Sequence, residues 1–372
     1  MRVKHTRGRV VDVTTLDDLD RRLAGGARAL AGWRLVRLDL TDRADALLDR
    51  SVQEALFLGC TFADGDAEAV RRAGGVVLPT IPDAPVDPYR ASLYAPRELY
   101  DTPRYRDSLD ARAYAWSQGH TGIDDQLAMD LHDHSVDVAL AGWLRGRSVV
   151  GVMGGHSLER GSEQYAAAAH LGHGLGAALT VATGGGPGAM EAANLGAFLA
   201  DEPTAAVDDA LARLATVPSF HHSIGAWART AFEVLDAHPG HESLGVPTWH
   251  YGHEPPNPFA TAIAKYFRNA TREAILLEVC DAGIVFLPGA AGTVQEVFQD
   301  ACENYYGDPA TIAPMVLVGV RHWTEDVPAW PLLQALARGR AMEPHIHLVD
   351  SLEEAVATIR LSRRDDGSQL GR

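Results

Sequence analysis

The sequence has few cysteines and no long apolar runs. Only Cys60, Cys280 and Cys302 occur in 372 residues, far apart and odd in number, which excludes a disulfide framework and fits a reducing compartment. No stretch approaches the roughly 18 uninterrupted apolar residues of a membrane helix. The N-terminus has no apolar core typical of a signal peptide. We therefore expect a cytoplasmic protein without a membrane partner.

Positive charge is also scarce. Lysine and arginine number 33 against 49 aspartates and glutamates, which gives a formal net charge of −16. Such a surface repels the backbone of a nucleic acid, and no basic stretch reverses this locally, so we expect no nucleic-acid polymer as partner. An anionic ligand would have to be held by local features, namely helix N-termini, backbone amides and a few placed arginines.

The rest of the composition is that of an ordinary globular protein, with 46% hydrophobic and 22% charged residues. Short β-like runs at 34–40, 54–60 and 75–79 alternate with short helices and predict a small N-terminal α/β extension over 1–100. A helical connection follows over 101–145 and ends in the amphipathic run 125–144. The tail 364–372 is polar and predicted to be disordered. No internal repeat is evident.

Apolar β runs recur from residue 146 to 363 with helices between them, at 148–153, 179–182, 246–251, 283–287, 315–320 and 345–349. Continuous apolar strands separated by helices indicate a parallel sheet covered on both faces. The sequence thus predicts an α/β fold with a Rossmann-like catalytic domain over 146–363. In such sheets ligands bind beyond the carboxyl ends of the strands, where the strand order reverses.

Three predicted strands end in glycine-rich turns, and two of these turns lead into helices. The turns are Gly154-Gly155-His156-Ser157, the segment 183–191 and the segment 288–293. Glycine lets backbone amides approach a ligand, and a helix start adds unpaired donors and a positive dipole end. The turns match neither a Walker motif nor a dinucleotide fingerprint. They predict an anion-bearing ligand, with candidate contacts at Gly154, Gly155, Ser157, Gly185, Gly186, Gly188, Gly289, Gly292 and Thr293.

The segment 288–296 resembles the PGGxGTxxE motif of the Lonely Guy family, the cytokinin riboside 5'-monophosphate phosphoribohydrolases, often mislabelled as lysine decarboxylases. The segment 184–191 is similar to that family's first glycine motif. The run 253–258 and the N-terminal extension are more like the larger bacterial members, which hydrolyse ordinary nucleotides. The resemblance covers about residues 145–362. One departure is Ala290 in place of the second glycine, which would be strained if the position needs a positive φ.

This resemblance implies hydrolysis of a nucleoside 5'-monophosphate to free base and ribose 5-phosphate, with AMP as the first candidate and cytokinin precursors as a further one. It implies Glu296 as the catalytic carboxylate, and Arg272 as the catalytic arginine if one residue is inserted before Pro288. It also implies a homo-oligomer, a dimer or larger. Met190, Glu191, His253 and Glu254 are further candidate substrate contacts. The mechanism needs no metal and no cofactor.

Other interpretations of these residues remain open. Thr293 and Glu296 have the spacing of a capping box, in which Glu296 would only close the start of a helix. Arg272 fits an exposed helix position as well as a ligand contact. A non-catalytic carrier of a phosphorylated cofactor such as molybdenum cofactor could share this fold. A lysine decarboxylase would need a pyridoxal-binding lysine, and the domain offers only Lys265.

The paired histidines do not predict a metal site. His132 and His134, His221 and His222, and His238 and His241 lack the ligand spacings of known zinc motifs. We expect them to be solvated or to cap helices. Arg90 and Tyr94 are expected to pack between domains.

Overall fold

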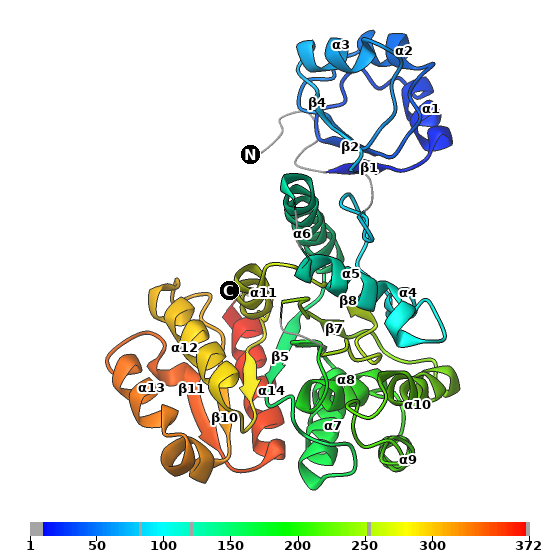
Figure 1. Ribbon diagram of the computed structural model, residues 1–372. Coiled ribbons are helices and arrows are strands. Elements are labelled where there is room, and N and C mark those ends of the chain that lie inside the picture. The colour runs from blue at the N-terminus through cyan, green and yellow to red at the C-terminus, as the bar shows by residue number, and fades with distance from the viewer. Residues whose placement is uncertain (1–9, 82–83, 120–121, 251–253, 370–372) are drawn as a thin grey trace. The chain divides into compact units, whose positions relative to one another are not determined.

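The computed structural model describes residues 10–81, 84–119, 122–250 and 254–369, with side chains up to Ser362 (Figure 1). The chain forms two compact units, one of residues 1–91 with 120–135 and one of residues 92–119 with 136–372. The long helix α6 (Ile123–Trp143) contributes its first part to one unit and its second part to the other. The connection predicted over 101–145 is therefore divided between the two units.

The first unit contains a parallel sheet in the order β1-β2-β3-β4, made of β1 (Val11–Val13), β2 (Trp33–Val36), β3 (Leu56–Leu58) and β4 (Val76–Leu78). Between the strands lie α1 (Leu16–Ala24), α2 (Ala44–Leu48) and α3 (Asp66–Arg72). Each predicted β run overlaps a strand that is shorter than the run, and β2 begins one residue before its run. Arg37 (φ 54°) adopts a left-handed conformation directly after β2, and Glu54 (φ 63°) adopts one shortly before β3. β1 was not predicted.

This unit is built from an internal repeat, contrary to the sequence-based expectation. Paired residues in successive strands are 22, 22 and 20 positions apart, namely Val11 with Trp33, Arg34 with Leu56 and Leu56 with Val76. A positive φ recurs at the same place in successive repeats, at Gly32, Glu54 and Gly74. Periods of about 20–29 residues are typical of solenoid-type repeats. The repeat escapes detection because backbone conformation and apolar strand positions recur, while the residues themselves change.

The second unit contains a seven-stranded parallel sheet in the order β11-β10-β9-β5-β6-β7-β8. The chain enters at the centre through β5, continues outward on one side to β8, and returns to the other side of β5 with β9. The strands are β5 (Val149–Met153), β6 (Thr180–Thr183), β7 (Leu244–Gly245), β8 (Ala262–Ile263), β9 (Ile284–Phe286), β10 (Met315–Val318) and β11 (Ile346–Val349). The predicted Rossmann-like α/β fold is thus confirmed, and its strand order reverses between β5 and β9.

One predicted strand is misplaced. The run beginning at Val246 is not a strand in its described part, and β7 ends just before it, at Gly245. Pro247 has no N–H to donate to a sheet ladder, which is why strands rarely continue through proline. β8 was not predicted, because two residues are too short for a periodic signal.

Helices cover both faces of the seven-stranded sheet. One face has α7 (Glu163–Gly176), α8 (Ala189–Phe198), α9 (Thr204–Leu214), α10 (Ile224–Ala237) and α14 (Leu352–Gln369). The other has part of α6 with α11 (Asn269–Glu278), α12 (Ala291–Tyr306) and α13 (Ala329–Ala337). The side chains of β5 contact both sets of helices. Val150 and Val152 pack into one core, with residues of α7, α8, α9, α10 and α14. Val149 and Met153 pack into the other core, with residues of α6, α11, α12 and α13. Alternate residues of a strand point to opposite faces, so a strand covered on both sides is apolar throughout.

The remaining helical elements of this unit are α4 (Pro96–Leu99), η1 (Tyr105–Asp107), α5 (Leu109–Gln118), η2 (His322–Asp326) and η3 (Glu343–His345). The backbone of α14 thus continues into the segment 364–372 that the sequence predicts to be disordered. Within the residues described above, no helix is both long and apolar enough to cross a bilayer.

Candidate active site

The glycine turns lie at the carboxyl ends of three neighbouring strands, β9, β5 and β6. A Cβ atom placed on Gly154 would lie 3.0 Å from the Ala189 side chain and 3.1 Å from the Leu287 side chain. A Cβ atom on Gly188, whose φ is +73°, would lie 2.6 Å from the Gly155 carbonyl oxygen. The structure therefore brings the three turns together. Gly188 leaves no room for a larger residue, and Gly154 leaves little.

The turn after β6 is fixed by buried amide side chains. The backbone amide of Asn257 donates to the Gly185 carbonyl at 2.8 Å, and its Nδ2 donates to the Gly186 carbonyl at 3.0 Å. Asn194 Oδ1 accepts hydrogen bonds from Asn257 Nδ2 at 3.1 Å and from Thr183 Oγ1 at 2.7 Å. Sequence reasoning missed the two asparagines as positioning residues, although Asn257 lies in the quoted run 253–258.

Two of the turn amides are already engaged within the chain. The Gly185 amide donates to Thr183 Oγ1 at 3.0 Å. The Gly289 amide nitrogen lies 3.3 Å from His322 Nε2, which is also 3.0 Å from the Gly289 carbonyl oxygen. His322 was not predicted to reach this site. The Ala189 amide, the first of α8, donates to the Gly155 carbonyl at 3.1 Å. The donors left for an anion are therefore the other amides in the first turns of α8 and α12, which have no partner within their own helix.

Helix α12 begins at Ala291, earlier than the sequence suggests. Its N-cap is Ala290, which has φ −111° and ψ −142°, so alanine is not strained in place of glycine. Thr293 is consequently the third residue of the helix, and Glu296 lies a further turn inside it. The capping-box interpretation of Thr293 and Glu296 is therefore wrong. A Cβ atom on Gly292 would meet nothing within 4 Å, so this helix start has open space beside it.

Arg272 is buried in α11 and contacts two strand ends. Its Nε donates to the Val246 carbonyl at 2.6 Å, and its Nη2 lies 3.3 Å from the Gly184 carbonyl. A Cβ atom on Gly184 would come within 2.3 Å of the guanidinium, so a larger residue there would displace the Arg272 side chain. Arg272 is thus an anchored part of the glycine-turn edge and not an exposed helix residue.

Glu273 joins α11 to α12 beside Arg272. Its Oε1 lies 3.8 Å from Arg272 Nη1 and accepts a 2.8 Å hydrogen bond from Asn269 Nδ2. Its other oxygen accepts a hydrogen bond from Gln295, the neighbour of Glu296. The sequence analysis assigned Glu273 no role. The structure makes it the link between the arginine and the helix that carries Glu296.

Glu296 is half-buried, and its surroundings favour the protonated form. Burial raises the pKa of Glu296 to about 7, the nearby Arg272 guanidinium opposes this rise, and the Glu273 charge adds to it. A carboxyl group with a pKa near neutrality can exchange protons with substrate or water at physiological pH. Asp300 follows on the same face of α12, and burial together with Glu303 raises its pKa to about 8. Asp300 was not predicted from the sequence.

A cavity of about 240 Å³ opens beside the start of α8. Its lining includes Ser157, Gly188 and Glu254, and His156 Nδ1 lies 3.7 Å from Glu254 Oε1. Met190 packs against the Gly184–Gly186 turn, since its Sδ would lie 2.7 Å from a Cβ atom on Gly184. Ser157, Gly188 and Glu254 therefore face one cavity. His253, the remaining candidate of this loop, lies outside the described residues.

Glu191 also lines this cavity, but its carboxylate is bound within the protein. Arg160 Nε lies 3.1 and 3.2 Å from its two oxygens, and both side chains are about 1% exposed. Arg160 Nη1 also donates to the Trp227 carbonyl at 3.0 Å and to Thr230 Oγ1 at 2.9 Å. Glu191 is thus part of a buried ion pair that joins α8 to α10.

Other candidates lie elsewhere. Lys265 is buried and its Nζ lies 2.6 Å from Asp110 Oδ1, which does not suit a pyridoxal-binding lysine. Among the residues that the structure describes, no group of three or more histidine, cysteine, aspartate or glutamate side chains could hold a metal ion.

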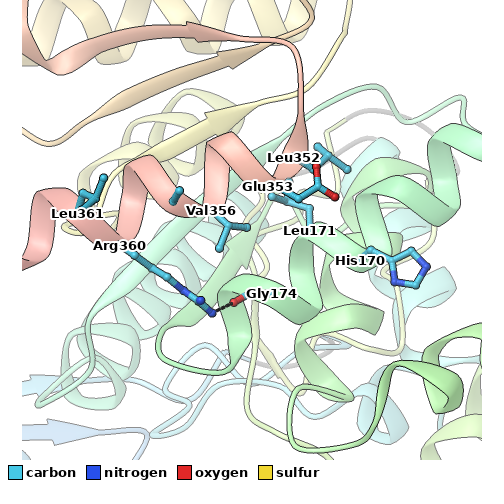
Figure 2. A pocket seen from close by; sticks show the side chains of 9 residues that line it. His170, Leu171, Gly174, Leu352, Glu353, Val356, Arg360 and Leu361 are labelled. Carbon is cyan, nitrogen blue, oxygen red and sulfur yellow. Dashed lines mark hydrogen bonds between the residues drawn. The ribbon is translucent and has the colours of Figure 1, made fainter.

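A pocket of about 540 Å³ between α7 and α14 is lined by Leu171, Val356 and Arg360 among others, and by no residue of the glycine turns (Figure 2).

No protein-family model and no curated protein matches the sequence. Among solved structures, the chain is similar to the molybdenum cofactor binding protein of Rippkaea orientalis, with 17% identity over 57% of this chain and 96% of that one and a TM-score of 0.35. It is likewise similar to the molybdenum cofactor carrier protein of Chlamydomonas reinhardtii, with 17% identity over 58% and 97% and a TM-score of 0.36. Because these scores are low, the fold is established here by the strand order alone.

Proposed function

We propose that this protein hydrolyses the N-glycosidic bond of nucleoside 5'-monophosphates, with AMP as the first substrate to test. The observation that carries the proposal is the position of Glu296. This carboxyl group lies in the second turn of α12, beside Arg272, at the edge of the sheet where the glycine turns meet. The likeness of segment 288–296 to the phosphoribohydrolase motif supports the same role.

In the proposed reaction the phosphate binds at the open start of α12, where free amides and the helix dipole favour an anion. One helical turn, about 5 Å, then brings the anomeric carbon near Glu296. The bond from this carbon to the base nitrogen breaks, and its electron pair leaves with the base. Positive charge develops on the ribose ring, which the Glu296 carboxylate stabilises. Water adds to the anomeric carbon and Glu296 accepts its proton. This proton is then passed to the nitrogen of the departed base, which leaves as the neutral molecule, and the Glu296 carboxylate is restored.

Incubation with a panel of purine and pyrimidine monophosphates, followed by chromatography, tests the proposal. The expected products are free base and ribose 5-phosphate in equal amounts. Binding of a monophosphate without release of base would favour a carrier, the second interpretation of this fold. A carrier has no need of a carboxyl group poised beside an arginine.

Turnover is expected to depend on pH through Glu296. Stabilising the developing cation requires the ionised carboxylate, and the pKa of Glu296 is raised to about 7. The rate should therefore fall by about tenfold per pH unit below this value and level off above it. A rate measured with saturating AMP that stays constant from about pH 5 to about pH 8 would contradict this assignment.

Activity is expected to survive removal of divalent cations. The proposed steps use only side chains and backbone amides of this chain and water. After prolonged treatment with EDTA and gel filtration, the rate of base release should remain within about twofold of the untreated protein, a negligible change in barrier. A complete loss that zinc or magnesium restores would show that the histidines or carboxylates had been misinterpreted.

A further inference from the structure

A second pocket of the larger unit, of about 670 Å³, lies between η1 and the start of α10. Its lining residues are Pro103, Arg104, Tyr105, Arg106, Phe220, His221, His222, Ser223, Ile224, Gly225 and Arg229. Three arginines and two histidines thus surround it, and no carboxylate lines it. The whole chain has a net charge of −16, so a pocket lined only by basic and neutral residues is opposite in charge to the protein as a whole.

The arginines of this pocket are available to a ligand. Arg104 and Arg106 share one acidic neighbour, Asp107, with an Arg104 Nη2–Asp107 Oδ2 distance of 2.7 Å and an Arg106 Nε–Asp107 Oδ1 distance of 3.8 Å. Their side chains are 69% and 74% exposed. Arg229 is exposed and forms no ion pair with the described residues. Two of these positive charges therefore remain uncompensated.

The walls between the arginines are held by internal contacts. The Tyr105 hydroxyl donates to Asp110 Oδ2 at 2.7 Å, which fixes η1. Phe220 lies against His221 with ring centroids 4.2 Å apart, and against Trp227 at 6.1 Å. The pocket is thus a preformed concavity, and preorganised donors lose less entropy when they bind a ligand.

We propose that this pocket binds a ligand carrying two or more linked phosphate groups. A guanidinium group can donate two parallel hydrogen bonds to the oxygens of one phosphate. Three guanidinium groups around one cavity therefore suit a ligand with several linked phosphates better than a single phosphate. The site is separate from the candidate catalytic residues, because neither Arg272 nor Glu296 lines it. Phe220 and His221 line both this pocket and the cavity beside α8, so the two sites share a wall. The proposal does not depend on the proposed hydrolysis.

Calorimetric titration of the full-length protein with inorganic tripolyphosphate tests this site. Tripolyphosphate is expected to bind the wild-type protein, and the double variant Arg106→Ala/Arg229→Ala to bind it at least about tenfold more weakly. Both side chains are exposed, so the variant should keep its fold and melting temperature.

The matched control is Arg97→Ala/Arg213→Ala. It removes the same charge from exposed arginines of the same unit that line neither the pocket nor the cavity. This control should bind tripolyphosphate within about twofold of the wild type. Equal weakening in both variants would mean that only the overall charge matters, and it would overturn the proposal. The absence of binding to the wild-type protein would overturn it as well.

Discussion

Replacing Glu296 by glutamine is expected to lower turnover of AMP by at least about 100-fold. Glutamine preserves the size and helical position of the side chain but removes the charge that stabilises the ribosyl cation. It also removes the proton acceptor for the attacking water. A single positioned acid–base group is worth roughly 10²–10⁴-fold, so the loss should be plain in single-time-point assays.

The melting temperature of Glu296→Gln indicates whether the fold is intact. The folded-state pKa of Glu296 is raised to about 7 from an ordinary 4.5, so the folded protein disfavours its ionised form. The stability contributed by the protonated group is lost as pH rises from 4.5 to about 7. At about pH 8 the variant should therefore melt at the same temperature as the wild type or at a higher one. Below pH 4.5, where the wild-type carboxyl group is protonated in both states, its melting temperature should not be higher than that of the wild type.

Glu303→Gln on the same helix is the matched control. Glu303 is exposed, and this substitution also removes one negative charge from α12. It should keep turnover within about twofold of the wild type. If Glu296→Gln retains more than about a tenth of wild-type turnover, Glu296 is not the catalytic carboxylate.

Replacing Arg160 by methionine is expected to lower the free energy of unfolding by about 3–5 kcal/mol. The substitution leaves the Glu191 carboxylate buried, about 1% exposed, without its partner. It also removes the donors to the Trp227 carbonyl and Thr230 Oγ1 that join this pair to α10. Urea denaturation measures the change.

Two further variants separate the buried charge from other effects of Arg160. The double variant Arg160→Met/Glu191→Met removes both charges and should recover most of the lost stability. Arg213→Met breaks an exposed pair with Glu233 and should cost no more than about 1 kcal/mol. If Arg160→Met lowers the free energy of unfolding as little as Arg213→Met does, the structural role of the ion pair is contradicted.

The fold of the larger unit could be predicted because its strands are apolar throughout and end in glycine turns. The strand Val149–Met153 is an example, since all of its residues are buried and its alternate side chains pack into the cores on the two faces. Val246 did not give a correct strand boundary, because the apolar signal continues through Pro247 while hydrogen bonding does not. The repeat of the smaller unit was missed because one of its three positive-φ positions is Glu54, and a positive φ cannot be recognised from a non-glycine residue type.

The candidate site could be predicted in its parts but not in its connections. Arg272 and Glu296 were found through the family resemblance. The structure adds that Arg272 is anchored to two backbone carbonyls and that burial raises the pKa of Glu296. His322, Asn194 and Glu273 reach the site from distant positions, through contacts that no local pattern encodes. The interpretation of Glu296 as a cap failed because α12 begins before Thr293, and helix starts are uncertain from sequence by a few residues.

A comparison of AMP with adenosine tests the central proposal most directly. Each is incubated with the wild-type protein, and free adenine is followed by chromatography. If the phosphate is held at the start of α12 while Glu296 acts on the ribose, adenine should be released from AMP at least about 100-fold faster than from adenosine, because the nucleoside lacks the group that orients it. Equal rates on the two compounds, or no adenine from either AMP or the other monophosphates, would contradict the proposed function.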